Sequence, residues 1–501
     1  MSWALLIIYT TIIFSLIRRL KFFQLEGLGT WAPSLFFGFK LLAGIALWCI
    51  YTYYYTDRTN SDIWKYFDDS KIMFDAIHAH PGDYFRMVSG IGDHTPAIEG
   101  TYYQEMNYWY RLFDNNLLND AHIVIRFNAL VRLISMGNYF THSLIMAFLS
   151  FVGLCCIYKT VFPALRQWRG AAAGIIFLLP SLLFWSSGVM KEGLMIFGLG
   201  LLIYHSFGFM NDKKWWRIIC LLMGATVLLF SKFYVIVGVV PPLIAALWVM
   251  KKNKHWLIKF SSVLILFILA SLSLRWIAPE REPLRLLANK QNDFLKMSTG
   301  GITLLNDSVE VFIADERRAD LIKKSDSTYH IRAGADYYYR PYLAGFYDTV
   351  FVKNNRDTSE YKIMTDIPKA GSLLNTGFLQ PNVSSFIKET PKAFFNVLLR
   401  PFIWEAKNPM FLLPALENLI FISMLLLIIF FRRKISDPAV FGFCLTFSLL
   451  LLLIIGLTTP VLGALVRYRI AAQPFLFIAL LMLVDREKVM RKFPSLAKLG
   501  V

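Results

Sequence analysis

The chain has 501 residues, of which 56% are hydrophobic and 16% are aromatic, and its mean hydropathy is +0.49. These values exclude a soluble globular protein of this length and indicate a polytopic membrane protein. The formal net charge of +18 does not indicate nucleic-acid binding, because the basic residues gather at the ends of apolar runs.

About eleven apolar runs are candidates for spans of a hydrocarbon core roughly 30 Å thick, although several are short. In chain order they cover residues 3–15, 34–54, 139–158, 171–185, 193–210, 218–230, 234–250, 256–274, 410–431, 439–457 and 470–484. The sequence therefore predicts an all-α polytopic bundle of about eleven transmembrane helices. The span interiors are nearly free of ionisable residues, which is not typical of a transporter.

Clusters of lysine and arginine follow every second span, and the positive-inside rule predicts that these connections are cytoplasmic. The N-terminus is then outside, the C-terminus is inside, and two long segments lie on the outer face of a bacterial inner membrane. We expect the following organisation: spans in 1–55, an outer loop in 56–138, central spans in 139–276, a second outer loop in 277–409, C-terminal spans in 410–485 and a cytoplasmic tail in 486–501. A strand-like patch at 308–313 leaves an α+β fold open for the second loop.

An acidic stretch directly follows the second apolar run and contains Asp57, Asp62, Asp68, Asp69 and Asp75. If this stretch is helical from Asp62 onwards, Asp62, Tyr66 and Asp69 share one face at i, i+4 and i+7 spacing. That face could line a cavity. The alternative is a solvated loop whose acidic residues cap short helices.

Lys191 and Glu192 lie in a very short turn between two predicted spans. One interpretation is a hairpin tip in which the two charges neutralise each other. In the other, Lys191 contacts a phosphate and Glu192 orients a sugar hydroxyl or the lysine.

Arg467 and Arg469 lie at the outer end of the last predicted span, against the positive-inside pattern. The guanidinium fork suits phosphate oxygens and keeps its charge, so these residues favour an anionic partner. Lys232, in another short outer turn, is a weaker member of this set. The alternative is pairing with lipid head groups or with the acidic loop.

Standard signatures of other chemistries do not occur in the sequence. We find no phosphate-binding glycine loop and no zinc-protease or serine-hydrolase motif. His78, His80 and His94 share one loop, but their spacing matches no standard zinc arrangement. We therefore expect no metal site and no cofactor.

Three sequence elements in this order resemble the GT-C superfamily of membrane glycosyltransferases, in particular its mannosyltransferase-like branch. They are SDIWKYFDDS at 61–70, after a span; PSLLFWSSGVMKE at 180–192; and RYRIAAQP at 467–474, where Ala472 replaces a proline common in the family. The resemblance implies a polyprenyl-phosphate-linked sugar as donor and membrane lipids as surroundings. The acceptor, which could be a glycan, a lipid or a protein, stays open.

The resemblance also implies roles for individual residues. Asp62, or else Asp57, would be the general base that takes a proton from the acceptor hydroxyl. Lys191, Arg467 and Arg469 would stabilise the leaving phosphate, with Glu192, Tyr66 and Asp69 as further substrate-binding residues. Three other functions remain open: an O-antigen-type polymerase or ligase, a transporter or flippase, and a non-catalytic envelope protein.

Overall fold

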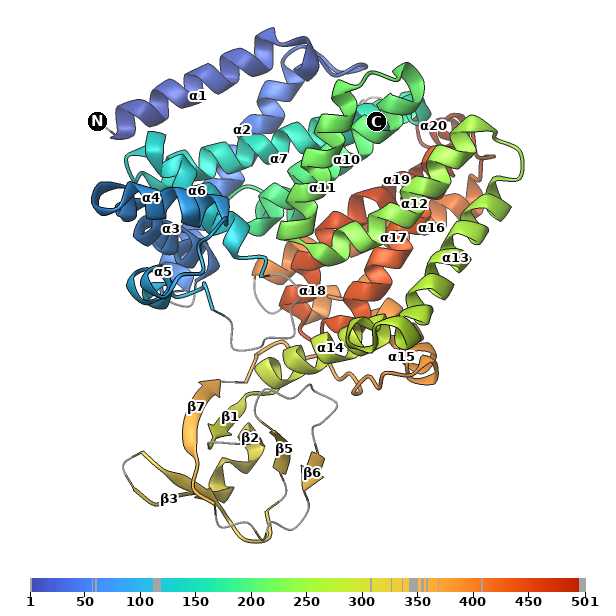
Figure 1. The fold of residues 1–501 in the computed structure, drawn as a ribbon. Coiled ribbons are helices and arrows are strands. Elements are labelled where there is room, and N and C mark those ends of the chain that lie inside the picture. Colours follow the sequence, from blue (N-terminus) through green and yellow to red (C-terminus); the bar gives the residue numbers. More distant parts are fainter. Residues whose placement is uncertain are drawn as a thin grey trace.

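The computed structural model describes residues 2–494 except 56, 59–60, 111–118, 307–308, 326, 336, 342–349, 353–355, 357–358, 368 and 407–408. In this part of the chain, eight helices are long and apolar enough to cross a membrane. They are α1 (Ser2–Arg19), α2 with its π-helical last turn (Ala32–Tyr54), α7 with its 3-10 extension (Tyr139–Ala164), α10 (Lys191–Asp212), α12 (Phe233–Lys251), α13 (Trp256–Ile277), α16 (Pro409–Phe430) and α17 (Pro438–Thr458). They agree with the prediction of a helical, polytopic membrane protein (Figure 1).

The other three predicted spans have different forms. Residues 171–185 do not make one helix but two short ones, α8 (Arg169–Phe177) and α9 (Pro180–Trp185), because proline has no N–H for the helical ladder. Residues 218–230 lie in α11 (Trp216–Ser231), whose 16 residues rise only about 24 Å. Residues 470–484 belong to a pair of helices, Leu462–Ala471 and Gln473–Met482, bent by 58°.

Close helix packing holds the centre of the bundle together. Helix α10 packs against α7 and α11, and α17 packs against α12 and α19 (Gln473–Met482). Gly200 of α10 meets Gly153 of α7, so a methyl group added at Gly200 would lie 2.5 Å from the Gly153 Cα. Small residues at such crossings let the backbones approach, as is common between membrane helices.

The first long segment folds into helices beside the bundle, coloured blue to cyan in Figure 1. They are α3 (Asp62–Ala79), α4 (Pro81–Ser89), α5 (Pro96–Thr101) and α6 (His122–Ser135). Helix α6 holds α3 through Arg132, which donates to the Ser70 hydroxyl at 2.9 Å and to the Phe67 carbonyl at 2.5 Å. The apolar side of α3 shares a core with Val189, Met190 and Leu194 at the start of α10.

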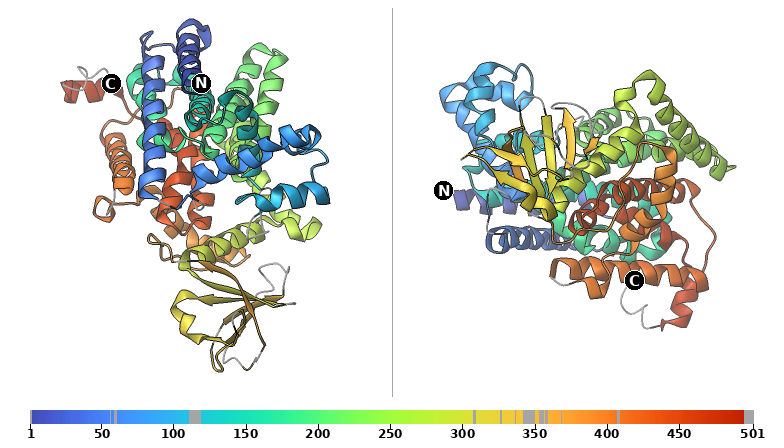
Figure 2. Two further views of the ribbon diagram at one scale, coloured as in Figure 1. Left: turned by 90° about the vertical axis from the view of Figure 1, so that its left-hand side faces the viewer. Right: turned by 90° about the horizontal axis from the view of Figure 1, so that it is seen from below.

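The second long segment carries a β-sheet that projects from the bundle, with α14 (Pro283–Thr299) between them (Figure 2). The five-stranded antiparallel sheet has the order β6-β5-β2-β1-β7, and β3 and β4 form a separate hairpin. The strands are β1 (Gly301–Leu305), β2 (Val309–Ala314), β3 (Leu321–Lys323), β4 (Tyr329–Ile331), β5 (Tyr337–Pro341), β6 (Val350–Val352) and β7 (Lys362–Ile367). At the base of the sheet, the Ala370 N–H donates to the Ser298 carbonyl at 2.8 Å, so the two ends of the sheet segment meet.

The chain then returns to the bundle through α15 (Val383–Leu399), which packs against α17. Before α15, the Leu374 N–H donates to the Pro460 carbonyl at 2.7 Å, and the Leu462 N–H donates to the Ser372 carbonyl at 2.9 Å. These bonds fix the start of α18 (Leu462–Tyr468), the helix that carries Arg467. The last helix is α20 (Arg486–Lys492).

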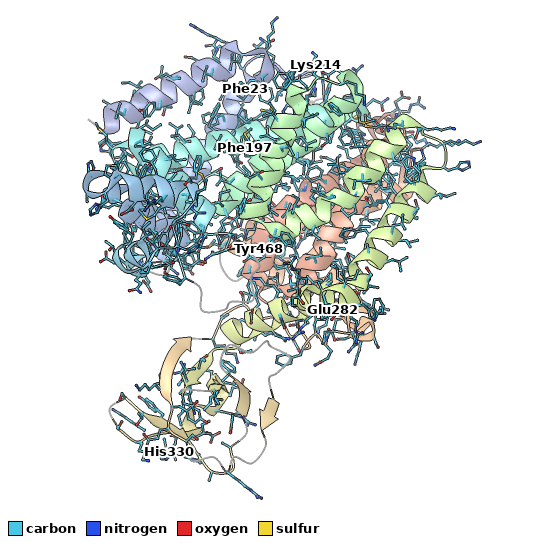
Figure 3. The ribbon with its side chains drawn as sticks, in the orientation of Figure 1. Phe23, Phe197, Lys214, Glu282, His330 and Tyr468 are labelled. Atoms are coloured by element: carbon cyan, nitrogen blue, oxygen red, sulfur yellow. The ribbon has the colours of Figure 1, made fainter. Side chains whose placement is uncertain are left out.

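The bundle has two distinct ends. Phe23 and Lys214 lie at the end away from the sheet, whereas Tyr468 and Glu282 lie at the end that faces it (Figure 3). The polar cluster described next is at the sheet-facing end.

Candidate functional site

Arg467 joins two carboxylates that come from distant parts of the chain. Its Nη1 lies 2.5 Å from Oδ2 of Asp62, its Nε lies 2.8 Å from Oε1 of Glu192, and its Nη2 lies 3.1 Å from Oε2 of Glu192. The contact with Glu192 is therefore bidentate, which is the strong and geometrically specific form of this pair. Helices α3, α10 and α18 meet at this point.

Both carboxylates lie at helix N-termini. Asp62 is the first residue of α3, and Glu192 is in the first turn of α10. The unpaired N–H groups and the dipole of a helix start favour a negative side chain. The apolar contacts between α3 and the start of α10 bring the two N-termini to the same place, which local sequence alone does not reveal.

Two lysines and a third carboxylate extend the cluster. Nζ of Lys191 lies 2.7 Å from Oδ1 of Asp120, and Nζ of Lys232 lies 3.5 Å from Oδ2 of Asp120 and 3.9 Å from Oε1 of Glu192. Lys191 and Glu192 thus pair with different partners, so the hairpin tip in which they neutralise each other is not what forms. We call Asp62, Asp120, Lys191, Glu192, Lys232 and Arg467 the charged cluster.

Aromatic rings surround the cations of the charged cluster. Lys191 Nζ lies 5.4 Å from the ring centroids of both Tyr66 and Tyr108, and Lys232 Nζ lies 4.6 Å from that of Tyr468. The Arg467 guanidinium lies 5.3 Å from the Trp185 ring. The Tyr66 hydroxyl is buried and has no hydrogen-bond partner among the described residues. Aromatic faces hold cations in place without neutralising them.

The electrostatics of Asp62 follow from this arrangement. Burial would raise the pKa of its carboxyl, but the charge and hydrogen bond of Arg467, helped by Lys191 and Lys65, hold that pKa below its ordinary value. The Asp62 side chain is 22% exposed and Arg467 14%, while Glu192 is 1% exposed. Asp62 is thus the more accessible of the two carboxylates, and Glu192 is the more deeply buried one.

Three of the residues proposed from the sequence lie apart from Arg467. Asp57 is exposed, and its carbonyl accepts from the Ser61 hydroxyl at 2.8 Å. Asp69 is buried, but its carboxylate accepts from the main-chain N–H groups of Asn107 and Tyr108, at 2.9 and 2.8 Å. It stabilises that loop, and burial raises its pKa to about 6.

The third, Arg469, belongs to a separate buried group. It donates to the Val397 and Arg400 carbonyls at 3.2 and 2.9 Å, and its Nη2 lies 3.8 Å from Oε2 of Glu417. Glu417 also accepts from the N–H and hydroxyl of Ser181, at 2.6 and 2.8 Å. Arg469 therefore ties α15, α16 and α9 together, and the structure does not bring it to Arg467.

Four charged residues were not predicted from the sequence or were given too little weight. Asp120 and Lys232 complete the charged cluster, and the only signal for them was their position at the end of a loop and in a short turn. Lys40 and Glu417 lie within predicted spans, and both are buried. They correct the expectation that the span interiors are nearly free of ionisable residues. Lys40 donates to the Ser186 and Ser187 hydroxyls, at 2.7 and 3.3 Å.

The fold and the charged cluster together define a polytopic membrane protein with a buried ionic site at one end of its bundle. No model of a protein family matches the chain, and neither a curated protein nor a solved structure matches it. In the part of the chain that the structure describes, no group of three or more His, Cys, Asp or Glu side chains is arranged to hold a metal ion.

Proposed function

We propose that this chain is an integral membrane glycosyltransferase of the GT-C kind. It transfers a sugar from a polyprenyl-phosphate donor to an acceptor at the outer face of a bacterial inner membrane. In this proposal the bundle crosses the membrane about eleven times, with α11, the α8–α9 pair and the α18–α19 pair as short or bent spans. The sheet-facing end then lies outside, with the N-terminus outside and the C-terminus in the cytoplasm.

The observation that carries the proposal is the contact of Arg467 with both Asp62 and Glu192. Each of these residues comes from one of the three sequence elements that resemble the family. The elements are more than one hundred residues apart from one to the next in the chain, yet their charged side chains meet. If Asp62 only capped a helix in solvent, or if Arg467 only contacted lipid head groups, these charged side chains would not need to meet.

The chemistry follows from the groups present. The acceptor hydroxyl oxygen forms a bond to the anomeric carbon, and the bond from that carbon to the phosphate oxygen breaks, with its electron pair leaving on the phosphate. Asp62 takes the hydroxyl proton. Arg467, Lys191 and Lys232 stabilise the charge that grows on the departing phosphate.

Asp62 is a weak base while it is paired with Arg467, because the pairing lowers its pKa. A donor phosphate that accepts hydrogen bonds from Arg467 removes this pairing. The pKa of Asp62 then rises towards the range that suits proton transfer. Donor binding thus activates the base.

The charges also balance through the reaction. The charged cluster has three carboxylates and three cations, so it is neutral as built. As the sugar leaves, the phosphate gains one negative charge while Asp62 loses one by protonation. A buried site avoids a net change in charge in this way, and such changes are costly at low dielectric.

The test is sugar transfer by the purified protein in lipid nanodiscs, with a panel of polyprenyl-phosphate sugars as donors. Asp62→Asn should lower kcat by about a hundredfold or more. Asp75→Asn is the matched control, because Asp75 lies on the same helix but is exposed and pairs only with Lys71 in the described structure. Undiminished transfer by Asp62→Asn would exclude Asp62 as the base.

The same assay distinguishes an O-antigen-type polymerase or ligase, in which arginine would be the main chemical group. That function predicts that Arg467→Met abolishes activity on a lipid-linked glycan while Asp62→Asn retains most of it. Glycosyl transfer from a polyprenyl phosphate instead requires both residues.

A further inference from the structure

A second polar surface lies between the end of α16 and helix α20, at the opposite end of the bundle from α18 (Figure 1). A shallow depression of about 350 Å³, open to the surface, is lined there by Phe430, Phe431, Lys488, Arg491 and Lys492. We call it the basic pocket. It contains three cations and two aromatic rings, and none of them takes part in the proposed transfer reaction.

Main-chain pairing builds the wall of the basic pocket. The Asp485 N–H donates to the Phe431 carbonyl, and the Arg433 N–H donates to the Leu483 carbonyl, both at 2.8 Å. These bonds join the segment after α16 to the segment after α19. They fix the position of α20 beside the end of α16.

The cations of the basic pocket are only partly compensated. Nζ of Lys488 lies 3.7 Å from Oδ2 of Asp485. Arg491 and Lys492 are exposed and make no ion pair among the described residues. The pocket thus offers positive charge to an anion that fits between α20 and the phenylalanine rings.

The apolar side of the basic pocket continues along α16. Leu426, Ile429 and Phe430 are 52%, 72% and 73% exposed, so this helix presents a hydrophobic face that leads to the cations. A soluble anion would use only the charges. A phospholipid would use both features, because its phosphate and its acyl chains are covalently joined.

We propose that the basic pocket binds the head group of an anionic phospholipid, whose acyl chains lie along the exposed face of α16. Arg491 and Lys492 bind the phosphate. Lys488 breaks its ion pair with Asp485 and binds the phosphate as well. The inference does not depend on the glycosyltransferase proposal, since the basic pocket and the charged cluster share no residue.

Binding can be measured by native mass spectrometry of the purified protein in detergent, titrated with phosphatidylglycerol. The triple variant K488Q/R491Q/K492Q should bind the tightest lipid at least tenfold more weakly than the wild type, because each basic residue near an anionic lipid strengthens binding. Phosphatidylcholine with the same acyl chains should bind weakly to both proteins.

The matched control is K251Q/K252Q/K254Q, which removes three exposed cations from the last residue of α12 and the turn that follows it, outside the basic pocket. It should keep the binding of the wild type. Equal losses in the two triple variants, or no loss in the pocket variant, would overturn the proposal. Displacement of the lipid by equimolar glycerol phosphate would also overturn it, because a free phosphate would then be the ligand.

Discussion

At the scale of single residues, position along the chain predicted only some members of the charged cluster. Asp62, Lys191, Glu192 and Arg467 were identified because each charge adjoins an apolar run. Asp120 had no such signal, since its role depends on the fold that brings it to Lys191 and Lys232. Arg467 and Arg469 looked equivalent in sequence, yet residues two apart on a helical segment point to different sides, and the two arginines contact different carboxylates.

Asp69 gives a prediction about pH. Its pKa is about 6 in the folded protein against an ordinary value of 3.8, so the unfolded chain loses this proton first. The contribution of Asp69 to the free energy of unfolding is therefore greatest below about pH 4. It falls by at most about 3 kcal/mol as the pH rises to 6. Melting temperatures in detergent between pH 4 and 6 should show this slope in the wild type.

Asp69→Asn should flatten that part of the profile, because asparagine does not titrate. At pH 4 it should lower stability by about 1–3 kcal/mol, since one amide oxygen cannot accept from both N–H groups as well as two carboxyl oxygens do. This deficit should shrink as the pH rises to 6, because only the wild type loses stability over that range. The same slope in variant and wild type would assign the titration to another group.

At the scale of elements, the sequence located the apolar segments but not their breaks. Hydropathy treats residues 171–185 as continuous, whereas Pro180 begins a new helix there. The turn that follows α9 carries Ser186 and Ser187, which accept from the buried Lys40. Mean hydropathy cannot indicate that one lysine in a span has hydroxyl partners on another helix.

The crossing of α7 and α10 supports a prediction on packing. Gly200→Ala should lower stability by about 1–3 kcal/mol, because its methyl group would push against the Gly153 backbone. Gly38→Ala is the matched control: Gly38 is also inside a long helix, and no atom would lie within 4 Å of its added methyl group. Both changes gain helix propensity equally, so the difference between their melting temperatures isolates the contact.

If Gly200→Ala melted at the same temperature as Gly38→Ala, the two helices would be packed less closely than described.

At the scale of the whole molecule, the class of protein was predictable because composition alone requires a membrane bundle. The arrangement of the second long segment was not, since a strand-like patch gives neither the partner strands nor their order. The sheet has its own apolar core, whose members all lie between Ile302 and Tyr361. It is therefore packed largely independently of the helices.

We predict that the sheet can be removed without unfolding the bundle. Replacing residues 301–367 with two glycines should change the melting temperature of the helical part by only a few degrees. Gly301 and Ile367 are paired partners, and paired strands lie about 5 Å apart, a gap that two residues can span. Circular dichroism and thermal melting in detergent measure the outcome.

A large loss of helicity in the deletion variant would instead show that the sheet is needed to assemble the bundle. If helicity is kept, the transfer assay on the same variant asks whether the sheet contributes to acceptor binding.

The bond between Ser298 and Ala370 has an evolutionary consequence. A module whose ends meet at one point of a host can be gained, lost or exchanged by one insertion or deletion. The ionic site would then descend with the helices, while the sheet could have a separate ancestry. Chains that share this bundle are accordingly expected to differ most at the junction after α14.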